Sequence, residues 1–507
     1  MTKLYPYQKE GVQLIEKFEG RFLLADEQGL GKTIQVMEYL RRHPKIRPAV
    51  IVCPASVKYV WQEQARDHCG LRTTICSGQK PPKKTLLHNK DIFVINYDIL
   101  FYWATYLRKL HPQLVILDEG HRIKSRGALR TRAARMLCAP LRKIPISQVH
   151  LANKAHLLRE DEAVWFEDTD GVRVDGFVSS ISGDGRVTIK TQVPHLGVLS
   201  GTPLTNRPSE LWSILNLIWP LYFPAFTPYA WEYCKPEMTP YGWQYKGAAN
   251  LDKLHRMLKR IGMIRRRKKD VLKDLPKKRR FVVPLDLANH KEYEDAKSDF
   301  INWLHRKDAS KAERASKAEK ITQMAYLKRL AAMGKLKGVF DWIDSFLEES
   351  DDKLLVGCMH HSVIDAIYNR YKSISLTFSG KTADKDRSRV IHAFRKDARK
   401  RIIIGQIQAI GTGVDGLQSV ACTSAVVELP WDPGTMGQFD DRIHRIGQKR
   451  DVSIYYLVAK GTLEETLCKL LQDKQEVLTR TLDGEEHVKG MSIDIYDRLE
   501  QELRTKK

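Results

Sequence analysis

Short apolar runs that alternate with helical patterns restrict the fold of this chain more than any other feature of its sequence. The runs lie at 22–25, 49–53, 92–95 and 114–117, and again at 354–357, 401–405, 425–429 and 453–458. They are apolar along most of their length rather than at every second residue, which is typical of parallel strands buried on both faces. The pattern predicts an α/β fold with two parallel sheets, one toward each end of the chain.

One segment, from about 146 to 191, breaks this alternation. Its segments with strand character are 163–166, 173–180 and 186–190, separated by glycines in the manner of hairpin turns. We expect a small all-β insertion, in which Trp165 stands near Asp168 and Asp170. Two interpretations stay open: a barrel that binds DNA or a cationic group of a partner, or a decoration whose aromatic residues form its own small core.

The expected domain order follows from these changes of pattern. A first domain covers 1–208 and is interrupted by 146–191, a helical region with a basic link covers 209–330, a second domain covers 331–480, and a helical tail covers 481–507.

The composition favours a polyanionic partner. The chain has 85 Lys and Arg against 61 Asp and Glu, a formal net charge of +24. A generally basic surface is the alternative. The eight cysteines are scattered, with no spacing that suggests a zinc site or a disulfide scaffold. No apolar run is long enough to span a bilayer, and the N-terminus lacks the pattern of a signal peptide. We therefore expect a cytoplasmic protein.

A glycine-rich loop follows the first apolar run. It reads Asp26-Glu27-Gln28-Gly29-Leu30-Gly31-Lys32-Thr33, and a helical pattern follows. This is the order of a P-loop, in which glycine N–H groups and a helix N-terminus surround phosphate oxygens. Asp26 stands where such loops usually have their first glycine. Lys32 is predicted to reach the β- and γ-phosphates of ATP and Thr33 to hold Mg²⁺, with Asp26, Gly29 and Gly31 completing the loop. The alternative is a glycine-rich turn that binds nothing.

Two carboxylates end the fourth apolar run. Asp118 and Glu119 follow 114–117, where a strand's carboxyl end could place them beside the bound nucleotide. Asp118 is the candidate for the metal shell and Glu119 the candidate general base that polarises the attacking water. An acidic helix cap is the alternative interpretation of these residues.

Taken in order, these blocks resemble the motifs of the Swi/Snf-related ATPases, a branch of the second helicase superfamily. The matching blocks are Leu4-Tyr5-Pro6-Tyr7-Gln8, 26–33, Asp118-Glu119-Gly120-His121, Ser200-Gly201-Thr202-Pro203 with Asn206 and Glu210-Leu211-Trp212, 265–276, Gln438 with Asp441-Arg442, and 444–448. The resemblance covers nearly the whole chain and implies two RecA-like domains of a compact bacterial or phage type. The insertion lies between His121 and Ser200, where the family normally has one helix and one strand.

The resemblance also implies roles. Gln8 would read adenine, Gln438 would contact the nucleotide, and Arg442 and Arg445 would be arginine fingers on the γ-phosphate. Counted inclusively, the two arginines lie four positions apart, which would place them on one face of a helix. Since they come from the other domain, hydrolysis would require the domains to close, and closure would be the mechanical stroke.

A basic stretch between the predicted domains is the first candidate for DNA contact. Residues 256–280 contain 13 Lys and Arg, among them Arg265, Arg266 and Arg267. Phosphate contacts from such a stretch are independent of sequence and sensitive to salt. A solvated charged linker is the alternative. By resemblance alone, further DNA contacts fall on Pro54, Asn96, Thr202, Gly380, Lys381, Gly411 and Thr412.

Three functions remain in competition. The leading one is a monomeric ATPase that moves along double-stranded DNA and remodels it or displaces a bound protein. The second is a helicase that remodels forks or anneals strands in repair. The third, a catalytically silent DNA-binding scaffold, would need a broken ATP site, but Lys32, Asp118, Glu119, Arg442 and Arg445 are all present.

Overall fold

The structure of this protein is a computed structural model. It describes residues 3–82, 91–139, 141–151, 163–167, 173–182, 184, 186–201, 203, 207–240, 242–306, 313–411 and 414–471. The chain divides into two compact units, Met1–Arg267 and Lys268–Lys507. Each unit is described by itself.

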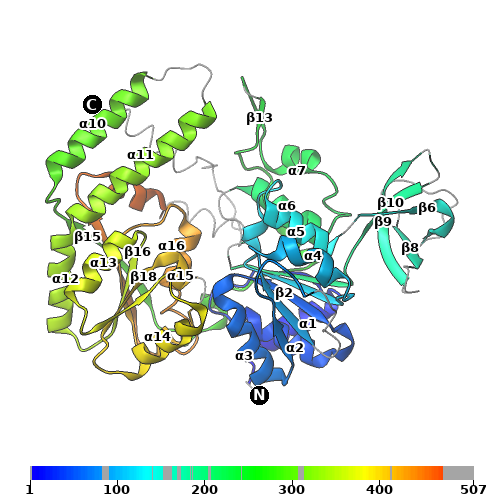
Figure 1. Ribbon diagram of the computed structural model, residues 1–507, viewed down its shortest axis with the longest axis horizontal. Coiled ribbons are helices and arrows are strands. Elements are labelled where there is room, and N and C mark those ends of the chain that lie inside the picture. The colour runs from blue at the N-terminus through cyan, green and yellow to red at the C-terminus, as the bar shows by residue number, and fades with distance from the viewer. Residues whose placement is uncertain are drawn as a thin grey trace. The chain divides into compact units, whose positions relative to one another are not determined.

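The first unit is built on a parallel sheet of seven strands (Figure 1). In spatial order the strands are β14 (Met263–Ile264), β1 (Arg21–Leu24), β11 (His195–Leu199), β5 (Leu114–Asp118), β2 (Ala49–Cys53), β4 (Ile92–Asn96) and β3 (Thr73–Ile75). All neighbouring strands pair in parallel, so their carboxyl ends meet at one edge. The loop after β1 and the acids after β5 therefore lie at the same edge of the sheet.

Helices cover both faces of this sheet, as the apolar runs predict. The helices are α1 (Pro6–Lys17), α2 (Lys32–Arg42), α3 (Lys58–Cys69), α4 (Leu100–Arg108), α5 (Leu129–Cys138), α6 (Pro208–Ile218), α7 (Phe226–Tyr233) and α8 (Leu251–Ile261). Side chains alternate along β1: Phe22 and Leu24 join the core beneath α1, α2 and α3, whereas Leu23 joins the core beneath α4 to α8. A parallel strand between two helical layers needs apolar residues on both faces, which explains the run.

The region expected to be separate at 209–330 is instead divided between the units. Leu211 and Ile214 of α6 and Leu254 and Leu258 of α8 pack into the core of the first unit. After α8 the chain adds β14 to the edge of the sheet beside β1. The first unit therefore extends past residue 208 to Arg267, because the apolar faces of α6 and α8 cover sheet surface that would otherwise be exposed.

The β-rich insertion is an antiparallel sheet of five strands. Its order is β6 (Leu141–Pro145), β10 (Arg186–Thr191), β9 (Arg173–Ser182), β8 (Ala163–Glu167) and β7 (His150–Leu151). The sheet starts one strand before residue 146, because β6 pairs with β10 from Arg186 to Lys190. Phe166 and Val178 lie in a small core of its own, and Trp165 stacks on His150 with ring centroids 4.1 Å apart. Asp168 and Asp170 lie outside the described residues.

The second unit contains a parallel sheet of six strands. Its order is β15 (Lys278–Leu285), β20 (Val452–Ala459), β19 (Thr423–Val426), β16 (Leu354–Cys358), β18 (Ile402–Gln406) and β17 (Ser375–Phe378). The helices are α9 (Lys268–Val271), α10 (His290–Arg306), α11 (Glu313–Gly334), α12 (Leu336–Glu349), α13 (His361–Arg370), α14 (Asp384–Lys396), α15 (Ile407–Gly411) and α16 (Pro433–Asp440). The two parallel sheets, together with the β-rich insertion, confirm the predicted α/β fold class. The expected tail at 481–507 lies outside the described residues.

The strand β15 was not predicted, since its first residues read as part of the basic link. Lys278 and Arg280, two positions apart, point to one face and pair with Asp441 and Asp440. Arg279, between them, pairs with Asp451 instead. Side chains that point to the same face at every second residue are typical of a strand. Their ion pairs show that Lys278 and Arg280 stabilise the second unit itself. No helix among the described residues has the length and apolar character needed to cross a membrane.

Candidate nucleotide site

The loop between β1 and α2 has the backbone geometry of a phosphate loop. Gly29 and Gly31 take positive φ angles of 86° and 73°, a conformation that costs glycine little. Helix α2 begins at Lys32, so the N–H groups of its first turn face the loop. This is the arrangement that favours an anion, because free N–H groups and the helix dipole act together.

Lys32 is buried within this loop. Its ammonium donates a hydrogen bond to the backbone carbonyl of Asp26 at 2.9 Å. Burial lowers the pKa of Lys32, and the carboxylates of Glu119, Asp26 and Asp118 act in the opposite direction. When a nucleotide binds, this buried ammonium can exchange its hydrogen bond with the Asp26 carbonyl for one with a phosphate oxygen.

The two acids at the end of β5 are held differently. The Asp118 carboxylate accepts a hydrogen bond from the Trp61 indole at 2.9 Å and one from the Glu119 N–H at 3.0 Å. Burial and the charge of Glu119 raise the pKa of Asp118. Burial also acts to raise the pKa of Glu119, but the hydrogen bond with His121 and the charge of Lys32 hold it below its usual value. Their environments therefore distinguish two adjacent carboxylates.

Glu119 is oriented by two residues, Gln28 and His121, which belong to the quoted motifs but were given no role from the sequence. Gln28 Nε2 donates to Glu119 Oε1 at 3.0 Å, and His121 Nδ1 lies 3.3 Å from Glu119 Oε2. His121 Nδ1 is also 3.4 Å from the hydroxyl of Ser200, the first residue of the predicted coupling motif. Glu119 itself has φ 54°, a strained conformation for a residue with a side chain. A contact chain therefore runs from the phosphate loop through Glu119 to Ser200.

The adenine-side prediction falls beside the same loop. The Gln8 amide donates to the carbonyl of Leu30 at 3.1 Å, and the hydroxyl of Tyr7 donates to the same oxygen at 3.1 Å. A Cβ built on Gly31 would lie only 2.5 Å from Gln8 Nε2, so the glycine is needed for this close approach. Gln8 thus lies against the loop, and its contact with a nucleotide stays a prediction.

Arg266 is not available to DNA in the way that was predicted. Its guanidinium forms two hydrogen bonds with the fully buried Asp26 carboxylate, Nε to Oδ1 at 3.0 Å and Nη2 to Oδ2 at 2.6 Å. Gln35 joins both partners, and Arg265 donates to the Ala25 carbonyl at 2.8 Å. A buried carboxylate needs a paired cation, so this part of the basic link supports the phosphate loop.

The predicted residues of the second unit gather at one loop. Arg442 donates to the carbonyl of Val414 at 2.8 Å and to that of Gly411 at 2.6 Å. Arg445 pairs with Asp415 at 3.4 Å. The two arginines do not share a helical face, because α16 ends at Asp440. Both arginines instead contact the short segment from Gly411 to Asp415.

A buried ionic cluster fixes the segment that carries these arginines. The Asp441 carboxylate accepts hydrogen bonds from Lys268 and Lys278, both at 2.9 Å. Lys268 also donates to the carbonyl of His444 at 2.6 Å, and His444 Nε2 donates to the carbonyl of Pro276 at 2.9 Å. These contacts of Asp441 and His444 order the segment from two sides and leave Arg445 partly exposed. Gln438, the predicted nucleotide contact, precedes the segment on α16 and is buried.

The remaining DNA predictions lie at the carboxyl edges of the two sheets. Pro54 follows β2 and Asn96 ends the neighbouring β4, where Cys53 and Asn96 are register partners. Gly380 follows β17 and donates its N–H to Gln406, which ends β18. Lys381 comes next and its N–H donates to the Ser379 hydroxyl. The predictions on Thr202 and Thr412 fall outside the described residues.

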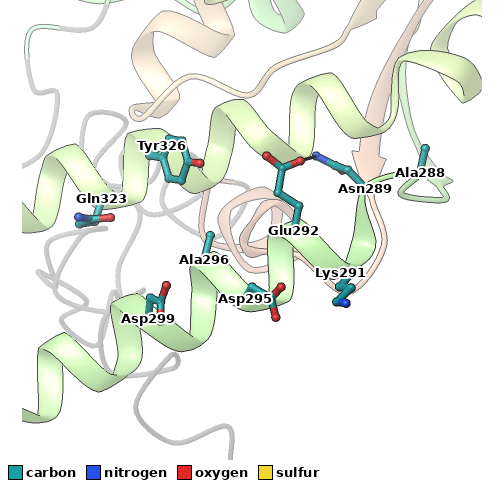
Figure 2. A pocket seen from close by; sticks show the side chains of 9 residues that line it. All are labelled: Ala288, Asn289, Lys291, Glu292, Asp295, Ala296, Asp299, Gln323 and Tyr326. Carbon is teal, nitrogen blue, oxygen red and sulfur yellow. Dashed lines mark hydrogen bonds between the residues drawn. The ribbon is translucent and has the colours of Figure 1, made fainter.

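The donor set fits magnesium held mainly through a nucleotide. Thr33 and Asp118 offer oxygen ligands, which Mg²⁺ prefers, and the described residues hold no group of three or more His, Cys, Asp or Glu that could bind a metal alone. An open groove of 720 Å³ lies elsewhere, between α10 and α11 (Figure 2). Its acidic residues Glu292, Asp295 and Asp299 would repel a nucleotide, so it is not a second candidate for this site.

Comparison with known proteins adds an independent observation. The SNF2-related domain family matches residues 7–147 and 181–337, more than half of the chain, and leaves out 148–180 within the β-rich insertion. A chromatin-regulator homologue from Caenorhabditis elegans, named SWI/SNF-related matrix-associated actin-dependent regulator of chromatin subfamily A-like protein 1 homolog, is 30% identical over 94% of this chain. The human DNA annealing helicase and endonuclease ZRANB3 is 31% identical over 95% of it.

The chain spans 62% of the first relative and 41% of the second. The solved structure titled Sulfolobus solfataricus SWI2/SNF2 ATPase core in complex with dsDNA covers 96% of this chain and 94% of its own, at 20% identity and a TM-score of 0.41.

Proposed function

We propose that this chain uses ATP to move along double-stranded DNA. The chain belongs to the SNF2-related family and is a helicase-like ATPase of that family. The observation that carries the proposal is the arrangement around Glu119. Gln28 and His121 hold its carboxylate beside the buried Lys32, at the edge of the sheet where the phosphate loop ends. A general base that activates a water next to a γ-phosphate must be held in position in this way.

Each residue then has a stated task. Lys32 and the loop N–H groups bind the phosphates, and Gln8 contacts the base. Glu119 accepts the proton of the attacking water. Thr33 and Asp118 would hold Mg²⁺, which when bound neutralises charge on the phosphate oxygens. Arg442 and Arg445 stabilise the charge that develops on the transferred group, so that hydrolysis depends on both units of the chain.

Double-stranded DNA is the partner we propose for three reasons. The net charge of +24 favours a polyanion. The family is one of DNA-acting motors by the resemblance of its motifs, and relatives are named for acting on DNA. Three lysines of the basic link, Lys269, Lys273 and Lys277, remain exposed. Arg265 and Arg266, by contrast, support the phosphate loop. The proposal includes three further points. The motor displaces a protein bound to DNA, it acts as a monomer, and it works in the cytoplasm, associated with the nucleoid.

Fork remodelling or strand annealing is the second candidate. It is favoured by the human relative, whose name states that it is a DNA annealing helicase. The two functions differ in what happens to the strands. Translocation on a duplex displaces a third strand from a triplex, whereas fork remodelling pairs and unpairs the strands themselves.

A triplex-displacement assay tests the proposal, with a forked duplex in a parallel reaction. We expect ATP-dependent release of the third strand by the wild type and none by Glu119→Gln. Release of strands from the fork without release from the triplex would favour the second candidate. No release from either substrate, together with ATP hydrolysis that ignores DNA, would exclude both.

A further inference from the structure

Two tryptophans on the first unit are exposed although they touch each other. Trp231 on α7 and Trp243 on β13 have ring centroids 4.9 Å apart, and 55% and 46% of their surfaces stay exposed. Met238 is 68% exposed. Large apolar side chains in such a cluster contribute little to stability while they remain in water, so their exposure calls for another cause.

The tryptophans belong to a small hairpin that stands apart from the main sheet. Its strands, β12 (Glu237–Thr239) and β13 (Gly242–Gln244), form a sheet of two strands. Met238 is the register partner of Trp243, and directly opposite residues of an antiparallel pair share a face. Figure 1 shows this hairpin beyond α7, away from the strands of the seven-stranded sheet. One face of the hairpin thus presents Met238 and Trp243 next to Trp231.

The hairpin is anchored at its base, so the aromatic surface is held in place. Tyr245, just after β13, packs edge-on against Phe226 of α7 with centroids 5.0 Å apart. At the other end of the hairpin, Thr239 donates its hydroxyl hydrogen to the carbonyl of Gly242 at 2.8 Å and holds the two strands together beside the turn. An isolated hairpin of two strands is marginal in water, and these contacts explain how this one can present a fixed surface.

A basic helical face adjoins the same place. Glu232, next to Trp231, accepts a hydrogen bond from Lys253 at 2.7 Å, and the carbonyl of Glu232 accepts one from Asn250 at 2.9 Å. These contacts join the end of α7 to the start of α8. Lys253, Arg256 and Arg260, all exposed, follow each other at spacings of three and four along α8 and so line one face of it.

From this juxtaposition we propose that the Trp231–Trp243 pair and the exposed face of α8 form a binding site for single-stranded DNA. The tryptophans would stack on unpaired bases, and Arg256 and Arg260 would contact phosphates. Aromatic rings beside a track of cations are the combination by which proteins bind single strands without regard to sequence. The site goes beyond translocation on a duplex, whose bases are already stacked, and it would give the motor a contact with an opened strand.

Binding of fluorescent oligo-dT to the full-length chain, without ATP, tests the proposal. The double variant W231A/W243A should bind roughly tenfold more weakly, since each stacked base contributes strongly to such affinities. An oligonucleotide of equal length with abasic sites in place of bases should not distinguish the variant from the wild type. W231F/W243F should recover most of the binding, because a ring is restored.

Two further variants separate the parts of the site. R256A/R260A should weaken binding of both oligonucleotides and reduce the dependence of affinity on salt. Tyr102→Ala is the matched control, because Tyr102 on α4 is 46% exposed, as Trp243 is. It should leave the affinity for both oligonucleotides unchanged.

Equal binding by W231A/W243A and the wild type would overturn the assignment and point to a protein partner for the aromatic pair. A loss of equal size on the abasic oligonucleotide would also overturn it. ATP hydrolysis stimulated by a blunt, fully paired duplex should be unchanged in W231A/W243A. If the wild type itself shows no such stimulation, the proposed motor function fails, whereas the oligo-dT result still decides this site.

Discussion

Arg266 and Asp26 lie 240 positions apart in sequence and form a buried, doubly hydrogen-bonded ion pair, with Nη2 to Oδ2 at 2.6 Å. The pair joins the first residue of the phosphate loop to the last residues of the first unit, just before the second unit begins at Lys268. Asp26 is fully buried and Arg266 nearly so. The carboxylate of this unusual aspartate in the loop thus has a structural partner, the guanidinium of Arg266.

Arg266→Ala should destabilise the first unit by about 3–5 kcal/mol, since it leaves a buried carboxylate without its cation. Chemical denaturation followed by circular dichroism measures this loss. The double variant D26A/R266A should lose less than the sum of the single variants, because the unpaired charge is gone.

The matched control is Arg66→Ala. Arg66 and Asp67 also form an Arg–Asp pair of 2.7 Å in the first unit, but both side chains are exposed. That variant should leave the unfolding transition in place. Equal loss in Arg66→Ala and Arg266→Ala would contradict the account of Arg266.

Gln28→Ala should lower kcat for ATP about tenfold and change KM little. Gln28 contacts Glu119 Oε1 through one hydrogen bond to a charged group, which is worth roughly 1.5 kcal/mol. Steady-state kinetics separates the two constants. If KM rises and kcat holds, Gln28 binds nucleotide rather than positions the general base.

Arg445→Ala should reduce kcat by about 10³-fold, the lower end of the effect of arginine fingers, while ATP binding persists. Arg445 is the cleaner test, because Arg442 also holds the loop carbonyls of Gly411 and Val414. The measurement is single-turnover hydrolysis beside binding of a fluorescent ATP analogue. Arg399→Ala, which removes an exposed arginine of the same unit, should hydrolyse ATP like the wild type.

His444 makes the stability of the second unit depend on pH. Burial, together with the charges of Lys278 and Lys268, lowers its pKa to about 4. Its folded-state pKa lies below the usual value of 6.5, so the unfolded chain binds more protons between these values. The free energy of unfolding should therefore fall as pH drops through that window, by up to roughly 3 kcal/mol.

Denaturant unfolding at about pH 7 and about pH 5 measures this loss in the wild type and in His444→Gln. The glutamine can still donate to the carbonyl of Pro276 but cannot gain a proton. The variant should lose clearly less stability than the wild type over this interval. Equal losses would show that His444 is not the group that titrates.

The fold and the phosphate loop could be predicted because their signals are local. A run of four to six apolar residues marks a doubly covered parallel strand, and the glycines before Lys32 mark a loop that needs positive φ. The family resemblance, too, is carried by blocks of adjacent residues, and the family match confirms it.

What could not be predicted depends on contacts between distant segments. Nothing near Gln28 shows that it will meet Glu119, and nothing near Arg266 shows that it will meet Asp26. The basic residues 265–280 looked uniform in sequence, yet the structure divides them between the phosphate loop and β15. A charged side chain reveals its role only when its partner is known.

The central claim, an ATPase that responds to duplex DNA, is tested most directly by the rate of ATP hydrolysis with and without a blunt DNA duplex. We predict a low rate without DNA and a rate at least about tenfold higher with it, lost in Lys32→Ala and Glu119→Gln, the second of which still binds nucleotide. Hydrolysis at the same rate with and without duplex DNA would contradict the account.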